Sequence, residues 1–167
     1  MRRGISDEGV RRIAGAVRAQ VSPDWIQGEP VFPDDYLYKS LVSAFADATR
    51  YLFTNIIENA LRQRGYVPGD DALENEVVSE VSAYIEDLVK YGARDVHNVL
   101  KSQTELDEAA FIGELKAEIE SQLDLMSNDA YEKYGTVIMN IGPVANEATD
   151  AVITMMHFYN RERGQRL

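Results

Sequence analysis

Two pairs of carboxylates stand at a spacing that metal-dependent chemistry could use. Glu105 and Glu108 are three residues apart, and so are Glu147 and Asp150. Residues three apart lie on one face of a helix, so each pair could offer its oxygens to a hard cation such as Mg²⁺. Acids are also expected in the first turn of a helix, where they complement its dipole. The pairs are therefore either candidate cation ligands or ordinary helix-start residues.

The two histidines lack the partners that a metal centre would need. A di-iron bundle uses Glu-x-x-His on two helices, but Arg94 and Thr154 stand three residues before His97 and His157. Neither histidine has a second one four residues away, as a zinc-protease helix requires. We therefore expect no metal or cofactor, and we predict that both histidines are semi-buried structural residues.

Other catalytic signatures are absent from the sequence. It contains no cysteine, no Gly-rich phosphate loop, no Walker lysine motif and no Gly-x-Ser-x-Gly elbow. Without a cysteine or a paired histidine, most nucleophilic mechanisms lose their usual groups. The sequence therefore predicts a protein that is not an enzyme.

One short run nevertheless carries a family resemblance. The segment Glu147-Ala-Thr-Asp150-Ala-Val-Ile resembles the second motif of the all-α nucleoside triphosphate pyrophosphatases of the MazG type. The resemblance implies that the two carboxylate pairs converge and hold Mg²⁺ against the phosphates of a nucleotide. A Mg-dependent pyrophosphatase is therefore one alternative function.

The elements that carry these groups are all predicted to be helices, because apolar residues recur at intervals of three or four along the chain. We expect helices over residues 6–20, 34–64, 72–101, 104 to about 126, and 144–163, with a short segment restarting at Asn128. The helix over 34–64 would have about 30 residues and occupy the centre. The predicted fold is an all-α helical bundle with this central helix and four or five further helices. It would form one domain over 1–167, with short basic extensions at about 1–5 and 161–167.

Charge is unevenly distributed along the chain, whose formal net charge is −11. Residues 70–132 hold seventeen Asp and Glu against four Lys and Arg, whereas both ends are rich in arginine. The central acid disfavours nucleic-acid binding except through the basic termini. On the predicted 72–101 helix, Glu76, Glu80 and Asp87 share a face, which is either solvated or a docking surface for a basic partner.

Two further resemblances concern assembly. The segment from Pro33 to Leu52, an acidic start followed by an Ala-rich amphipathic stretch, resembles the opening long helix of head–tail adaptor proteins of tailed viruses. That resemblance implies subunits that form rings through neighbour contacts. A short helix followed by a long central helix is also similar to histone-fold subunits of transcription complexes, which implies pairing with other proteins.

The sequence thus predicts a structural protein that acts through contacts with copies of itself or with other subunits, such as a viral connector or another particle component. Candidate interface residues are the aromatic ones of the 34–64 helix and the terminal arginines: Tyr36, Tyr38, Tyr51, Phe53, Arg2, Arg3, Arg161, Arg163 and Arg166. The aromatic residues could equally belong to the core. With no membrane span and no signal-like start, we expect a cytoplasmic or particle-associated protein that is neither secreted nor transmembrane.

Overall fold

The computed structural model describes residues 7–20, 36–65, 69–101 and 107–162. Within these ranges the chain forms six helices and no strand, which confirms the predicted all-α bundle. The helices are α1 (Asp7–Gln20), α3 (Tyr36–Ala48), α4 (Arg50–Gln63), α5 (Asp71–Leu100), α6 (Glu108–Tyr134) and α7 (Ile141–Glu162).

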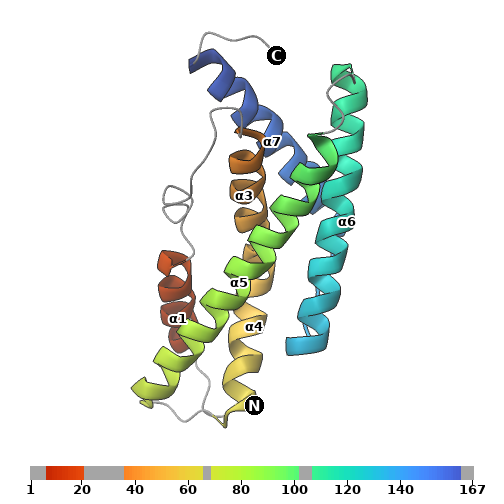
Figure 1. The fold of residues 1–167 in the computed structure, drawn as a ribbon. Helices are drawn as coiled ribbons and strands as arrows, with labels where there is room; N and C mark the ends of the chain where they lie inside the picture. The colour runs from red at the N-terminus through yellow and green to blue at the C-terminus, as the bar shows by residue number, and fades with distance from the viewer. Residues whose placement is uncertain (1–6, 21–35, 66–68, 102–106, 163–167) are drawn as a thin grey trace.

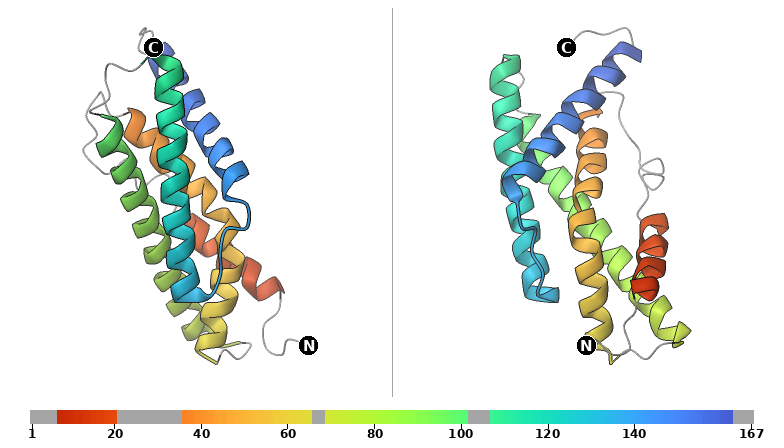
Figure 2. Two further views of the ribbon diagram at one scale, coloured as in Figure 1. Left: turned by 90° about the vertical axis from the view of Figure 1, so that its right-hand side faces the viewer. Right: turned by 180° about the vertical axis from the view of Figure 1, so that it is seen from behind.

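Helix α5 is the longest element and packs against α1, α3, α4 and α6, whereas α7 packs on α3 and α6 (Figure 1). Helix α5 has 30 residues and crosses the bundle obliquely, with α3 and α4 stacked nearly end to end behind it. Helix α1 packs on α5 and α4 along one flank, and α6 packs on α5 and α7 along the opposite flank (Figure 2). The two flanks of the bundle are therefore formed by different helices.

The predicted continuous helix over 34–64 is wrong in one place, because Thr49 separates α3 from α4. The Thr49 N–H still donates to the Phe45 carbonyl (3.1 Å), but the Thr49 carbonyl accepts from the Leu52 N–H (2.9 Å) in a tighter turn. The buried Thr49 hydroxyl also donates to the Ala46 carbonyl (2.6 Å). A threonine that bonds back to the preceding turn bends a helix. The bundle does contain a helix of about 30 residues, but it is α5.

Aspartates start the two longest helices. The Asp70 carboxylate accepts a hydrogen bond from the Leu73 N–H (3.1 Å) ahead of α5, and the Asp107 carboxylate accepts one from the Ala110 N–H (2.7 Å) ahead of α6. Both contacts satisfy an amide that has no partner within its helix. The predicted start of α6 at Thr104 lies outside the described residues.

The predicted break near Asn128 is also wrong, because α6 continues to Tyr134. Ser127 and Ala130, on either side of it, are buried, so this turn packs against the bundle like the turns before it. The helix ends at Gly135, whose φ of 68° is a left-handed conformation that favours glycine. Asparagine and aspartate can start a helix, but here tertiary packing holds them within one.

The final helix, α7, begins at Ile141 rather than at the predicted Val144. Pro143 stands in its first turn, where a missing N–H costs little because amides there have no helical partner. The Val144 N–H donates to the Asn140 carbonyl (3.3 Å). The first turn therefore forms around the proline instead of after it.

The core is formed by the apolar faces of all six helices. In α1 the predicted inward residues Val10, Ile13, Ala14 and Val17 are all buried. Between α3, α5 and α6, Phe45 packs where α5 carries glycine: a Cβ on Gly92 would lie 3.8 Å from both the Phe45 ring and the Met126 sulfur. Across the described ranges, no helix combines the length and the apolar character that crossing a bilayer requires.

Candidate interaction surface

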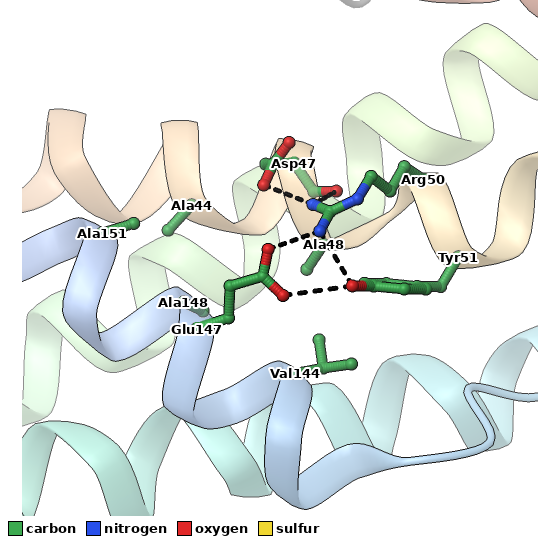
Figure 3. Close-up of a pocket in the computed structure, with 9 residues that line it drawn as sticks. All are labelled: Ala44, Asp47, Ala48, Arg50, Tyr51, Val144, Glu147, Ala148 and Ala151. Carbon is green, nitrogen blue, oxygen red and sulfur yellow. Dashed lines mark hydrogen bonds and ion pairs between the residues drawn. The ribbon is translucent and has the colours of Figure 1, made fainter.

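Glu147, the best candidate for a cation ligand, is held by two residues at the junction of α3 and α4 (Figure 3). Its carboxylate accepts from the Arg50 guanidinium (2.5 Å) and from the Tyr51 hydroxyl (3.1 Å). Arg50 also lies over the Tyr51 ring, 4.5 Å from its centroid, and pairs with Asp47. The hydrogen bond from Arg50, and then that from Tyr51, lowers the pKa of Glu147.

The space beside this cluster measures about 10 Å³, which is room for about one water molecule. Val144, Ala148 and Ala151 of α7 line it together with Ala44 of α3. The cluster therefore joins α7 to the bent α3–α4 region.

The second carboxylate pair does not reach the first. Glu108 lies 3.8 Å from the His157 ring nitrogen, and His157 is ten residues beyond Glu147 on α7. At 1.5 Å per residue, that is about 15 Å along the helix. Glu105 lies outside the described residues, and Asp150 is exposed. No group of three or more His, Asp or Glu side chains converges anywhere in the described ranges.

The prediction that both histidines are semi-buried is wrong for His157, whose side chain is 47% exposed, whereas His97 is half-buried on α5. The His97 ring meets the edge of the Tyr38 ring with the centroids 5.9 Å apart and the planes at 75°. This contact joins α3 to α5 and places Tyr38, a predicted interface residue, partly inside the bundle.

A polar cluster joins α4, α5 and α6 near the other end of the bundle. The Glu80 carboxylate accepts from the Tyr134 hydroxyl (2.9 Å) and forms an ion pair with Arg64. Beside it, the Tyr84 hydroxyl donates to Asp129 (2.5 Å), and the Tyr84 and Tyr134 rings pack edge to face at 5.2 Å. Burial favours the neutral form of Glu80, but the hydrogen bonds from Arg64 and Tyr134 outweigh it and lower the pKa of this carboxyl.

The acidic residues predicted to share one face of α5 therefore have different environments. Glu76 and Asp87 are exposed, and Glu86 pairs with Lys90 at 2.9 Å, whereas Glu80 is half-buried in the polar cluster. The sequence alone does not separate Glu80 from its neighbours, because its partners come from two other helices.

An open groove of about 450 Å³ lies between α5 and α6. A shallower hollow of about 650 Å³ lies between α4 and the end of α6. The lining of the groove between α5 and α6 includes Asp87 and Tyr91 from α5 and Gln122, Leu125 and Asp129 from α6. Tyr91 is 63% exposed and Leu125 is 56% exposed. Two large apolar side chains thus face solvent beside two carboxylates. We refer to this groove as the α5–α6 groove.

Two further acidic residues lie next to the α5–α6 groove, one on each of the helices that form it. Asp95 follows Tyr91 by four residues on α5, and Glu118 precedes Gln122 by four on α6, so each shares the face of its neighbour. One cation, Lys133, lines the groove, and its ammonium lies 4.9 Å from the centroid of the Tyr84 ring. The groove and its borders are therefore mainly apolar and acidic, with two cations nearby: Lys133 in the lining and Arg94, which lies 6.0 Å from the centroid of the Tyr91 ring.

The opposite flank of the bundle is basic. On α1, Arg11, Arg12 and Arg18 are exposed. Arg12 pairs with the buried Glu74 at 2.7 Å, and the Arg18 guanidinium lies over the Phe53 ring at 5.4 Å. These contacts hold two of the three arginines in place on the surface.

Of the interface residues predicted from sequence, Tyr51 is exposed but bound to Glu147, and Phe53 is buried at 4% exposure. Phe53 is thus a core residue in this chain, as one of the two interpretations of these aromatics expected. The other predicted interface residues have side chains that the structure does not describe: Tyr36, Arg2, Arg3, Arg161, Arg163 and Arg166.

Sequence reasoning missed Tyr91 and Leu125. Tyr91 did carry a signal, because it stands four residues after Asp87 and thus on the acidic, outward face of its helix. An aromatic residue on a polar face is a better indicator of an interface than one on an apolar face.

No protein-family model, curated protein or solved structure matches this chain. Its function is therefore inferred from its own residues.

Proposed function

We propose that this protein is a non-catalytic assembly subunit that associates with copies of itself through the α5–α6 groove. The observation that carries the proposal is the exposure of Tyr91 and Leu125 together on the groove, whereas most other large apolar residues that the structure describes are buried, Tyr131 and Met139 being the other strongly exposed ones. Exposed apolar side chains that gather beside a groove are typical of protein contacts, and aromatic residues often anchor them.

Catalysis is not part of the proposal, because the carboxylates with suggestive spacing have other partners. Glu147 is engaged by Arg50 and Tyr51, and Glu108 lies beside His157. These contacts support structural roles for the groups that resembled a magnesium site.

A second copy of this chain is the occupant that its own charges favour. The groove carries Asp87 and Asp129, while the α1 flank of the same chain carries exposed arginines. One chain thus holds both halves of a complementary pair. The narrower hypothesis of a connector-like particle component adds the expectation that the assembly closes into a ring.

The test is the mass in solution measured by light scattering. We expect the mass of the wild-type protein in solution to be two or more times the chain mass of 18.8 kDa, in whole-number steps. The double substitution Tyr91→Ser with Leu125→Ser should lower the mass to that of one chain without loss of helical circular dichroism. A matched control is Met139→Ser, which removes a side chain that is 83% exposed but lies outside the groove lining. A wild-type mass of one chain at high concentration would contradict self-association, and an unchanged mass in the double variant would contradict the groove.

A further inference from the structure

We infer that the α5–α6 groove of one copy receives the arginine face of α1 from the next copy, so that copies join head to tail. This inference rests on the proposed self-association and specifies which surface fills the groove. It follows from the juxtaposition in one chain of an acidic, aromatic groove on one flank and an exposed arginine face on the other.

The groove offers the groups that bind a guanidinium. The Asp87 side chain is exposed, and Asp129, which also lines the groove, uses one of its two oxygens, Oδ2, to accept from the Tyr84 hydroxyl. Carboxylates form the strongest hydrogen bonds with arginine. The Tyr91 ring already has the Arg94 guanidinium of its own chain 6.0 Å from its centroid, but it is 63% exposed, so a guanidinium of the next copy can stack on it as well.

The outer face of α1 has a shape that suits this groove. Arg11, Gly15 and Arg18 recur at intervals of four and three residues, so they share one face of the helix. Gly15 has no side chain, and no atom lies within 4 Å of where a Cβ would stand. The helix surface therefore has a shallow depression at Gly15 between the two arginines, where an apolar side chain such as Leu125 of the next copy can approach closely.

A two-fold contact of groove against groove is the competing arrangement, and charge opposes it. It would bring Asp87 and Asp129 of one copy against the same residues of the other, in a chain that already carries a net charge of −11. Like charges placed opposite each other across an interface are strongly unfavourable. A contact between the α1 flank and the groove pairs opposite charges instead.

The positions of the two surfaces also determine the kind of assembly. Helix α1 and helix α6 lie on opposite flanks of the bundle when it is seen from behind (Figure 2, right), so one copy can use both surfaces at the same time. A contact between two different surfaces repeats until the rotation closes a ring or continues as a filament. Head-to-tail pairing therefore predicts assemblies larger than a dimer.

Two charge reversals test the pairing. Arg11→Glu removes the basic partner, and Asp87→Arg removes the acidic one; each should weaken self-association by roughly tenfold or more. A one-to-one mixture of the two variants should recover association, because each variant then finds a complementary surface on the other. Lys116→Glu, an exposed position on α6 outside the groove lining, makes the same charge change as Arg11→Glu and should leave the mass unchanged.

The outcomes separate this inference from the proposed function. If the wild-type chain is monomeric, self-association itself is wrong. If Asp87→Arg changes the mass but Arg11→Glu does not, the groove is an interface and the α1 pairing is wrong. Failure of the mixture to recover association would also overturn the pairing. Raising the salt from about 0.05 M to about 0.5 M should dissociate a charge-paired assembly, because the screening length shortens severalfold, whereas an apolar two-fold contact would persist.

Discussion

Replacing Tyr134 with phenylalanine tests whether the polar cluster stabilises the bundle. The substitution removes the hydroxyl that donates to Glu80 at 2.9 Å and leaves the ring, which packs against Tyr84 at 5.2 Å, in place. The packing term should therefore stay nearly constant. What is lost is one hydrogen bond to a charged group.

The magnitude follows from the exposure of the acceptor. Hydrogen bonds to charged groups contribute about 1.5–3 kcal/mol, and the loss should fall below this range here because the Glu80 side chain is 36% exposed and water can replace the lost donor. Arg64 also continues to pair with Glu80. We expect the free energy of unfolding to fall by about 1 kcal/mol. With a denaturant slope of about 2 kcal/mol per molar urea, the urea midpoint should fall by about 0.5 M.

The dependence on pH gives the prediction a second readout. The pKa of Glu80 is lowered in the folded chain, so its ionised form contributes stability above the pKa of the unfolded chain, and this contribution is lost as the pH falls through the folded pKa. Part of that contribution is the hydrogen bond from Tyr134. The difference between Tyr134→Phe and wild type should therefore be largest near about pH 7 and shrink below about pH 4.

Urea unfolding followed by circular dichroism measures both effects. Tyr131→Phe is the matched control, because Tyr131 is on the same helix but 62% exposed, and it should shift the midpoint by much less. An unchanged midpoint in Tyr134→Phe, an equal shift in the control, or a difference that does not depend on pH would refute the stabilising role of the cluster.

Three further predictions concern the core and the tyrosines. Ser40 and Ser82 bury hydroxyl oxygens that have no hydrogen-bond partner in the described part of the chain, so Ser→Ala at either position should raise the free energy of unfolding by about 1 kcal/mol in urea titrations; a decrease would mean that the hydroxyl is satisfied. Phe45→Ala should lower it by about 3–5 kcal/mol, measured in the same way, because the ring is buried where α3, α5 and α6 meet, and a loss below about 1 kcal/mol would contradict that packing. Burial, and then hydrogen bonds to carboxylates, raise the pKa of Tyr84 and Tyr134. Tyrosinate absorbance should therefore show both rings still neutral above about pH 10, where tyrosines of the unfolded chain ionise and the stability of the fold begins to fall. Ionisation of all nine tyrosines near the usual pKa would contradict this.

Local patterns in the sequence determined much of the fold. The apolar spacing of α1 and α5 places their inward residues correctly, and the acids at Asp70 and Asp71 mark the start of α5 within one residue of its predicted position. These features depend on residues within one or two turns of each other, which the sequence displays directly.

The errors lie where local patterns allow two outcomes. Apolar residues keep their helical spacing across Thr49, so periodicity does not reveal that its hydroxyl and carbonyl form a tighter turn. Asn128 and Asp129 suit a helix start as well as a helix interior, and burial of Ser127 and Ala130 against the bundle favours the interior. The choice depends on packing with distant segments.

The candidate site depended still more on tertiary structure. The spacing of Glu147 and Asp150 suggested a cation site, but Arg50 and Tyr51, almost a hundred residues away, bind Glu147. The sequence by itself determined that this chain is an acidic all-α protein with arginine-rich ends. Only the tertiary structure decided which acids are paired and which apolar residues stay exposed beside them, because a side chain's partners are set by the packing of helices and not by its neighbours in sequence.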